Sequence, residues 1–375
     1  MFRRGAVVLT VAVLMASAVA CAPPTPGTAR AISPNDGTGY VQPQISGDGN
    51  TVVYRREADQ NAAFDTPRDL VVTRVDTQST AVFPSVRDVY AVSHDGRFVV
   101  YGYTTTVRLD TVTGDEEILR TADGDSLSDV AISADGSSVG WVATHYSPGG
   151  NCPCERRIHV WRDGTETLDV LMEGPIYIGI GDQFRDSLWM KADGSAVFAH
   201  RFATRDVVRF DSDTGASSVV PLQFPTIGDI SPFPSLQSYL FWSEWLQFSS
   251  SDGSHFLLKA GDTMFMLSSG APQVIDPVPG STGTWAMSSN ARFRAGIVST
   301  PVRPGVDDLA YVVTDLSSGE SRNVIESESS DPGGTGPAKT FNGAPSVADN
   351  GRVTYGLWAP LPTGPWPPSV IYVDR

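Results

Sequence analysis

A short turn motif, Ser-x-Asp-Gly or a close variant, recurs seven times along this chain of 375 residues. The third position of each copy is acidic or an amide: Asp48, Asp95, Asp135, Asp193, Asp252, Asn290 and Asn350. Glycine follows in six of the seven copies, as expected of a turn residue with positive φ, and the Asp or Asn can bond its own backbone. Internal repetition at this spacing indicates a repeat architecture and constrains the fold more than any other feature.

Runs of β-branched and aromatic residues follow the turns and are typical of strands, as in Thr51–Tyr54 and Phe98–Tyr101. Farther along, a second run ends near an Asp and a Gly turn, as in Val107–Asp110 before Gly114, and a last short strand closes the unit. No segment has a helical period. Each unit is therefore predicted to contain four antiparallel strands, which is the blade of a β-propeller.

The spacing of the motifs predicts the number of blades. Successive motifs lie 38 to 60 residues apart, and a blade takes about forty residues, so we expect seven blades; six blades and a stray motif are the alternative. The last unit ends at Val370–Asp374 without a fourth strand, while a spare strand-like segment, Thr28–Ile32, precedes the first blade. We therefore predict an all-β, seven-bladed β-propeller over residues 29–375, whose N-terminal strand closes the last blade and removes an open edge.

The first twenty residues have the pattern of a secretory signal peptide. Arg3 and Arg4 precede an apolar run, and the small residues Ala18-Val19-Ala20 precede Cys21. This order resembles a bacterial lipobox, in which the cysteine is lipidated, except at Ala18, where Leu is usual. Ordinary signal peptidase cleavage beside a chance cysteine is the alternative. We predict a signal peptide over 1–20, a lipid anchor at Cys21 and a Pro-rich tether over 21–28.

Cys152 and Cys154 remain if Cys21 carries lipid. Their Cys-Pro-Cys spacing predicts a small, strained disulfide. Free thiols in a loop are one alternative. A metal site with His145 and His159 is another, although a structural zinc ion takes four ligands. The five histidines show no ligand spacing, and we expect neither a metal nor another cofactor.

Charge restricts the partners. The net charge is −15, and removal of Arg3 and Arg4 makes it two units more negative. A strongly acidic surface disfavours nucleic acid and anionic lipid headgroups as partners. We expect a monomer that meets the membrane only through its lipid anchor.

The turn motifs resemble the repeat of TolB-like, WD-repeat-like bacterial propellers, whose hallmark is a Ser-Pro-Asp-Gly turn between the first two strands. The resemblance extends over nearly all of the chain after the signal peptide and implies the propeller architecture. The chain has no room for the separate N-terminal α/β domain of TolB, and seven motifs replace its six blades. The partners of TolB are therefore not carried over.

The meander of strands predicts where a ligand would bind. The Asp-Gly turns and the Thr-Gly turns fall on one face, and the longer connections fall on the other. Because binding residues favour loops on a rigid scaffold, we predict that the binding face lies opposite the Asp-Gly turns. Aromatic residues that can stack on sugars or anchor peptides occur in those connections: Phe64, Tyr146, Tyr177, Phe233, Tyr239 and Trp366. Capping of the blade ends is their alternative role.

Catalytic signals are weak. Gly136–Gly140 matches Gly-x-Ser-x-Gly but lies inside a repeat turn and strand, without the required strand-to-helix elbow. Asp123, Asp125 and Asp129 lack the spacing of a known calcium loop. We identify no catalytic residue, and three functions stay open. One is an exported, lipid-anchored scaffold at the outer face of the cytoplasmic membrane or in the cell envelope, where it binds a protein, peptide or glycan. Another is a glycan lyase or hydrolase with carboxylates at the channel mouth. The third is a purely structural or spacer role.

Overall fold

The computed structural model describes residues 29–34, 38–57, 68–86, 88–102, 105–121, 126–145, 154–176, 188–201, 206–222, 244–260, 263–270, 273–275, 281–303, 306–328, 341–358 and 369–374. Its regular elements are strands, β1 to β28. None of the described residues forms a helix long and apolar enough to cross a membrane.

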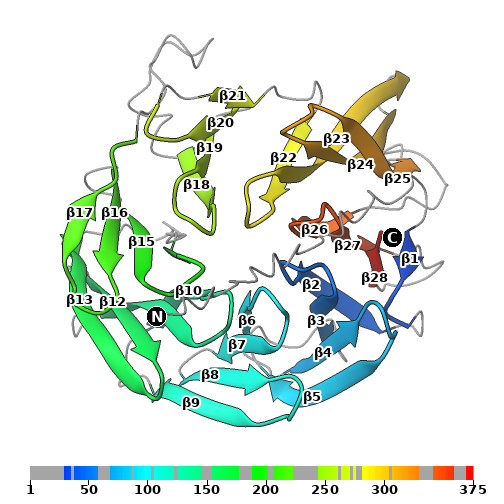
Figure 1. Ribbon diagram of the computed structural model, residues 1–375. Coiled ribbons are helices and arrows are strands. Elements are labelled where there is room, and N and C mark those ends of the chain that lie inside the picture. The colour runs from blue at the N-terminus through cyan, green and yellow to red at the C-terminus, as the bar shows by residue number, and fades with distance from the viewer. Residues whose placement is uncertain are drawn as a thin grey trace, which may run out of the picture.

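The described strands form seven four-stranded antiparallel sheets arranged around a common axis (Figure 1), which we call blades 1 to 7. Blade 1 contains β2 (Gly39–Ile45), β3 (Thr51–Glu57), β4 (Arg68–Arg74) and β5 (Thr80–Val86). Blade 2 contains β6 (Asp88–Val92), β7 (Phe98–Gly102), β8 (Thr105–Asp110) and β9 (Glu116–Thr121). Blade 3 contains β10 (Ser126–Ile132), β11 (Ser138–His145), β12 (Cys154–Arg162) and β13 (Thr165–Ile176). Blade 4 contains β14 (Leu188–Met190), β15 (Ala196–Arg201), β16 (Asp206–Asp211) and β17 (Ser217–Val219).

Blades 5 to 7 continue the same order. Blade 5 contains β18 (Glu244–Ser249), β19 (Phe256–Ala260), β20 (Thr263–Leu267) and β21 (Gln273–Ile275). Blade 6 contains β22 (Ser281–Met287), β23 (Phe293–Arg303), β24 (Val306–Asp315) and β25 (Ser321–Glu328). Blade 7 contains β26 (Phe341–Val347), β27 (Val353–Trp358), β28 (Ser369–Val373) and, from the other end of the chain, β1 (Arg30–Ala31).

The N-terminal strand β1 completes the last blade. It pairs antiparallel with β28, with Arg30 opposite Val373 and Ala31 opposite Tyr372, and the Ile32 amide donates to the Ile371 carbonyl at 2.9 Å. The predicted all-β propeller and its closure by the N-terminal strand are thus confirmed. The seven sheets of the described residues agree with the seven predicted blades.

The core lies between blades rather than within them. Each pair of neighbouring blades, including blades 7 and 1, shares one buried hydrophobic cluster. Strand alternation explains how one strand serves two clusters: Val52 and Tyr54 join the cluster with blade 7, while Val53 joins that with blade 2. Burial of a side chain of this size is worth roughly 1.5–3 kcal/mol. The ring is therefore stabilised by every blade contacting both neighbours.

The repeated turn joins the first two strands of each blade, and blade 2 shows its bonds. The Ser93 hydroxyl donates to Asp95 Oδ1 at 2.7 Å, and the same oxygen accepts the Arg97 amide at 3.0 Å. The Phe98 amide donates back to Ser93 Oγ at 2.9 Å. These local bonds explain why Ser and Asp recur at fixed positions of the turn.

The glycine of the motif is required for two reasons, and Gly136 illustrates both. Its φ is 73°, and a Cβ at this position would clash with the ring of Phe98 in blade 2. Gly136→Ala is therefore expected to lower the free energy of unfolding by about 2–4 kcal/mol, because the backbone strain and the overpacking add. Urea unfolding followed by tryptophan fluorescence measures this change.

Gly164→Ala is the matched control. Gly164 has a φ of 86°, but nothing lies within 4 Å of the Cβ that alanine would add. This variant is expected to lose only the backbone contribution, about 1–2 kcal/mol. Equal losses in the two variants would contradict the role given to the contact with Phe98.

Candidate functional site

The seven turns converge around the axis (Figure 1), and the second residue of each turn faces the next blade. We call these residues the axial ring: Gly47, His94, Ala134, Ala192, Ser251, Ser289 and Asp349. Four consecutive backbone bonds run from blade 2 to blade 6, each from the amide of one ring residue to the carbonyl of the next, with lengths of 3.0, 2.8, 2.7 and 2.6 Å. The amide of Asp349 donates to the carbonyl of Gly47 at 2.8 Å, and the Asp48 amide donates to the His94 carbonyl at 2.9 Å.

The side chain of Asp349 makes the remaining connection, between blades 6 and 7. Its Oδ2 accepts the hydroxyl of Ser289 at 2.6 Å, and its Oδ1 accepts the amide of Asn290 at 2.8 Å. Asn290 Nδ2 donates to the Asp349 carbonyl at 3.0 Å. A carboxylate thus replaces the backbone bond found at the other interfaces, and the described turns are linked all the way around the axis.

His94 spans blade 1 to reach the same carboxylate. Its Nε2 lies 3.1 Å from Asp349 Oδ2, although His94 belongs to blade 2 and Asp349 to blade 7. Gly47 of the intervening blade 1 leaves space for this contact, because a Cβ at that position would clash with the imidazole. We call the contact between His94 and Asp349 the axial ion pair.

The two groups of the axial ion pair stabilise each other's charge. The hydrogen bond to Asp349 raises the pKa of His94 above its ordinary value. Burial alone would raise the pKa of Asp349, but the bonds from His94, Ser289 and the Asn290 amide together hold it below its ordinary value. The contact therefore favours the charged form of each group.

The residue types of a hydrolase triad meet here in Ser289, Asp349 and His94, but the order in which they are hydrogen-bonded differs. In a triad the histidine accepts the proton of the serine and the aspartate orients the histidine. Here the serine donates to the aspartate, which also faces the histidine nitrogen. The imidazole does not stand between the serine and the carboxylate, as it does in a triad, so this geometry joins blades.

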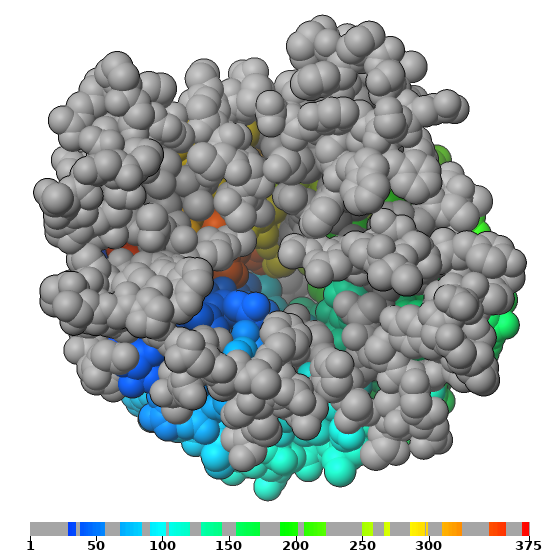
Figure 2. Space-filling model, turned by 180° about the vertical axis from the view of Figure 1, so that it is seen from behind, coloured from blue at the N-terminus to red at the C-terminus, as the bar shows by residue number. Residues whose placement is uncertain are grey.

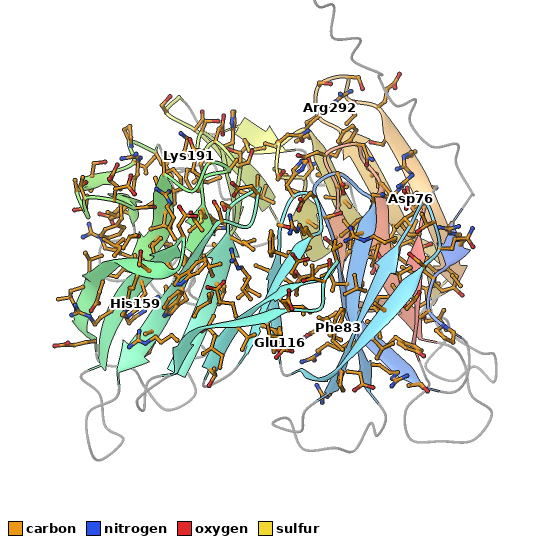
Figure 3. All side chains as sticks on the ribbon, turned by 60° about the horizontal axis from the view of Figure 1, so that its bottom comes forward. Asp76, Phe83, Glu116, His159, Lys191 and Arg292 are labelled. Carbon is orange, nitrogen blue, oxygen red and sulfur yellow. The ribbon has the colours of Figure 1, made fainter. Side chains whose placement is uncertain are left out.

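Arginines add a second set of bonds between blades on the turn side. Arg108 donates to the Gly136 carbonyl at 2.6 Å, Arg322 to that of Gly351 at 2.7 Å, and Arg352 to that of Gly49 at 2.7 Å. In each case the acceptor is the motif glycine of the following blade. Lys191 and Arg292, which flank or belong to these turns, lie at the same end of the molecule (Figure 3). The turn side is thus a rigid, densely bonded surface.

His159 forms a second cluster with carboxylates, in the outer part of blade 3 (Figure 3). Its Nδ1 bonds to Glu166 and lies 3.7 Å from Asp169 Oδ1. These three groups could in principle hold a metal ion. Arg120 of blade 2, however, donates to His159 Nε2 at 2.6 Å, so Nδ1 carries the proton and points it at Glu166.

The surroundings of His159 also oppose a cation. Burial lowers the pKa of His159, and the imidazole stacks on Trp141 with centroids 5.5 Å apart. Arg157 donates to Asp169 at 2.6 Å, which places a second guanidinium beside the same carboxylates. The residues fit an electrostatic link between blades 2 and 3 better than a metal centre.

Asp129, one of the three acidic residues considered above for a calcium loop, lies on the inner strand β10. Its Oδ1 accepts the Val130 amide at 2.9 Å and its Oδ2 accepts the Leu188 amide of blade 4 at 2.7 Å. Burial raises its pKa to about 7. Because its carboxylate accepts backbone amides of blades 3 and 4, Asp129 joins these two blades. Asp123 and Asp125 lie outside the described residues.

Only some of the other predicted site residues lie among the residues that the structure describes. Cys21 and Cys152 lie outside the described residues. So do the six aromatic residues of the long connections: Phe64, Tyr146, Tyr177, Phe233, Tyr239 and Trp366. Cys154 begins β12. Ser138 of the Gly-x-Ser-x-Gly match is buried in β11 and accepts a bond from Arg162 Nε at 2.9 Å, as suits a structural residue.

The sequence reasoning missed the axial ion pair. His94 and Asp349 are 255 positions apart, and each lies in a turn where an ordinary polar role suffices. One signal was available: most second positions of the motif hold small residues, and only His94 and Asp349 carry titratable groups there.

No protein-family model and no curated protein matches this chain. Among solved structures, the β-propeller domain of the Trilobed protease from Pyrococcus furiosus aligns with a TM-score of 0.57 and 10% identity, over 91% of this chain and 96% of that domain. The β-propeller domain of Cps50 (Swd1) from Myceliophteria thermophila aligns with a TM-score of 0.50 and 11% identity, over 92% of this chain and 99% of that domain.

An acylaminoacyl peptidase from Pyrococcus horikoshii aligns with a TM-score of 0.53 and 12% identity, over 90% of this chain and 51% of the peptidase. The chain thus spans about half the length of that enzyme. At such low identities the likeness concerns the fold alone. By its fold, the chain is a β-propeller similar to those of peptidases and to the propeller domain of Cps50 (Swd1).

Proposed function

We propose that this chain is an exported, lipid-anchored propeller of the TolB-like repeat type that binds a protein, peptide or glycan on the side opposite its Asp-Gly turns. The observation that carries this proposal is the axial ring. Backbone amides and carbonyls of its residues bond to neighbouring blades, so they are not available to a ligand. A rigid scaffold that uses its turns for its own closure leaves recognition to the opposite side.

The opposite side is where the longer connections start and end. Seen from behind, the inner strands of blades 1, 2 and 3 reach the middle of the molecule (Figure 2). We propose the six aromatic residues predicted in those connections as the binding set.

The competing proposal, a glycan lyase or hydrolase, needs a pair of carboxylates, or a histidine and a carboxylate, converging on a substrate. In the described part of the chain, the carboxylates of Asp129 and Asp349 accept backbone amides of neighbouring blades. The His159 cluster lies away from the axis and is occupied by Arg120 and Arg157. These arrangements favour a scaffold over an enzyme.

Two substitutions on the binding side, Tyr146→Ala with Trp366→Ala, test the proposal. The natively produced protein would be used to capture partners from the envelope, with a glycan panel measured in parallel. The double variant is expected to lose at least about tenfold in affinity, which is the effect of removing about 1.4 kcal/mol from aromatic anchors.

The control for this experiment is Val112→Ala on the turn side. Val112 is 69% exposed between β8 and β9, and its truncation is expected to leave binding unchanged. Loss of binding in the control with retention in the double variant would reverse the assignment of the two sides. Turnover of a glycan by the wild-type protein would support the enzyme instead.

A further inference from the structure

The direction of β1 fixes the side from which the chain enters the propeller. Arg30 lies opposite Val373 and Ala31 opposite Tyr372. Val373 is at the turn end of blade 7, because the next residue, Asp374, accepts the Val353 amide at 2.6 Å just after the turn. β1 therefore begins on the turn side and runs away from it.

Contacts with blade 1 support the same direction. The guanidinium of Arg30 donates to the carbonyl of Val75, which follows β4 at the turn end and precedes Asp76 on the turn side (Figure 3). Farther along, the Tyr54 hydroxyl donates to the Ile32 carbonyl at 3.3 Å, and Ser33 Oγ accepts the Ile371 amide at 2.8 Å. The start of β1 is therefore held on the turn side by two blades.

The segment before β1 is short. Seven residues, Ala22 to Thr28, separate the predicted lipid anchor at Cys21 from Ala29, which packs against the cluster between blades 6 and 7. Such a segment spans at most about 30 Å when fully extended, and about 25 Å as a Pro-rich chain. A seven-residue strand already spans about 23 Å, so a tether that ran back along a blade would use nearly all of its length and reach at most about 7 Å beyond the far end, whereas a tether that leaves from the turn side keeps its full length.

We propose that the turn side of the propeller faces the membrane and that the opposite side points away from it. This rests on the proposed function, since it requires the lipid anchor at Cys21. The anchor leaves from the turn side, and the body of the propeller lies between the bilayer and the binding side. The ligand is then a macromolecule that stands off the bilayer, a protein or a glycan strand, and not a lipid headgroup.

The charge of the turn side fits a tethered surface that does not adsorb to lipid. The turn residues Asp48, Asp95, Asp135, Asp193 and Asp252 are exposed there. Lys191 and Arg292 on the same side are paired with Asp193 and Asp315, so the carboxylates of the other turns oppose adsorption to anionic headgroups.

Resonance energy transfer to the membrane tests the orientation. The natively lipidated protein, carrying Cys152→Ser and Cys154→Ser, would receive a single donor dye at Val112→Cys or at Thr105→Cys. These positions lie at opposite ends of β8 in one blade: Val112 follows the turn end, and Thr105 begins the strand at the other end. The proteins would be reconstituted into phosphatidylcholine vesicles that contain an acceptor-labelled headgroup lipid.

Transfer from position 112 is expected to be about twofold or more higher than from position 105, because the strand places them about 20 Å apart along the axis. Equal transfer, or higher transfer from position 105, would overturn the orientation while leaving the anchor and the binding role intact. The mass of the N-terminal peptide reports the anchor separately. If Cys21 carries no lipid, the proposed anchor is wrong, and the orientation that depends on the anchor is wrong with it. Urea unfolding of both labelled variants verifies that they are folded.

Discussion

Asp349→Ala is expected to lower the free energy of unfolding by about 2–4 kcal/mol, the cost of removing a charged acceptor that several donors share in a partly buried network. The carboxylate accepts bonds from Ser289 Oγ and the Asn290 amide and faces the imidazole of His94. Its loss leaves all three donors without this acceptor, and between the turns of blades 6 and 7 it leaves the bond from Asn290 Nδ2 to the backbone carbonyl of residue 349. Urea denaturation measures the effect, and a smaller m-value would indicate that the ring has opened before global unfolding.

Ser251→Ala provides the control at the equivalent position of blade 5. The ring bond of Ser251 is made by its backbone amide, at 2.6 Å from the Ser289 carbonyl, and alanine retains it. The expected change is within about 1 kcal/mol. Equal losses in Asp349→Ala and Ser251→Ala would show that any change in the turns destabilises the ring, and the special role of the carboxylate would be wrong.

The effect of Asp349→Ala should vary with pH. The pKa of His94 is raised, so its contribution to stability is complete below about pH 6.5 and is lost as the pH rises through the raised value. The pKa of Asp349 is lowered, so its contribution is present above about pH 4 and is lost as the pH falls through the lowered value. The difference between wild type and variant should be largest near pH 5–6 and about 0.5–1 kcal/mol smaller at pH 9, a modest change because the His94 side chain is 42% exposed and screened.

The blade repeat could be predicted from sequence because its signals are local. A serine, an aspartate and a glycine within four positions satisfy one another's hydrogen bonds, as in Ser93 to Gly96. The following strand alternates in a pattern that any propeller would need. The pairing of β1 with β28 was also accessible, since a chain with an incomplete last blade and a spare first strand has one economical closure.

The axial ion pair could not be predicted in the same way. His94 and Asp349 meet only because the ring brings blade 7 next to blade 1, and because Gly47 leaves space between them. Nothing in the local sequence of either turn encodes this distance. The contacts of Arg108 could not be predicted from sequence either. Its guanidinium lies 4.4 Å from the ring of Trp161 and donates to the Gly136 carbonyl of the next blade.

The position of the binding side could be predicted from sequence, but its ligand could not. The meander predicts which end of the blades carries the long connections, and the described turns do lie together at the other end. The identity of a ligand depends on how side chains of several connections combine, and short polar and aromatic segments contain no periodic signal for that. The six aromatic residues therefore stay a prediction.

Removing everything before Asn35 from the mature protein, and with it β1, is expected to be the most damaging change outside the axial ring. It deletes the bonds of Ile32 and Ser33 with Ile371 and those of Arg30 and Ile32 with blade 1. At about 1 kcal/mol for each of these four bonds, with about 1 kcal/mol more for the partly buried Ile32, the loss is about 5 kcal/mol. It also uncovers the edge of β28, which favours association with other chains. Denaturation and size-exclusion chromatography over a range of concentrations measure the two effects.

A protein beginning at Ala29 is the control, since it lacks the tether but retains β1, and it is expected to match the full mature chain. A synthetic peptide covering residues 29–38 should restore part of the stability lost by the shorter protein, because it can pair with β28. The propeller domain from Pyrococcus furiosus is described as having an open velcro topology, so a propeller need not be closed by its first strand. If the truncated protein kept its stability and stayed monomeric, this ring too would hold through its interblade clusters and turns, and β1 would serve chiefly to fix where the tether begins.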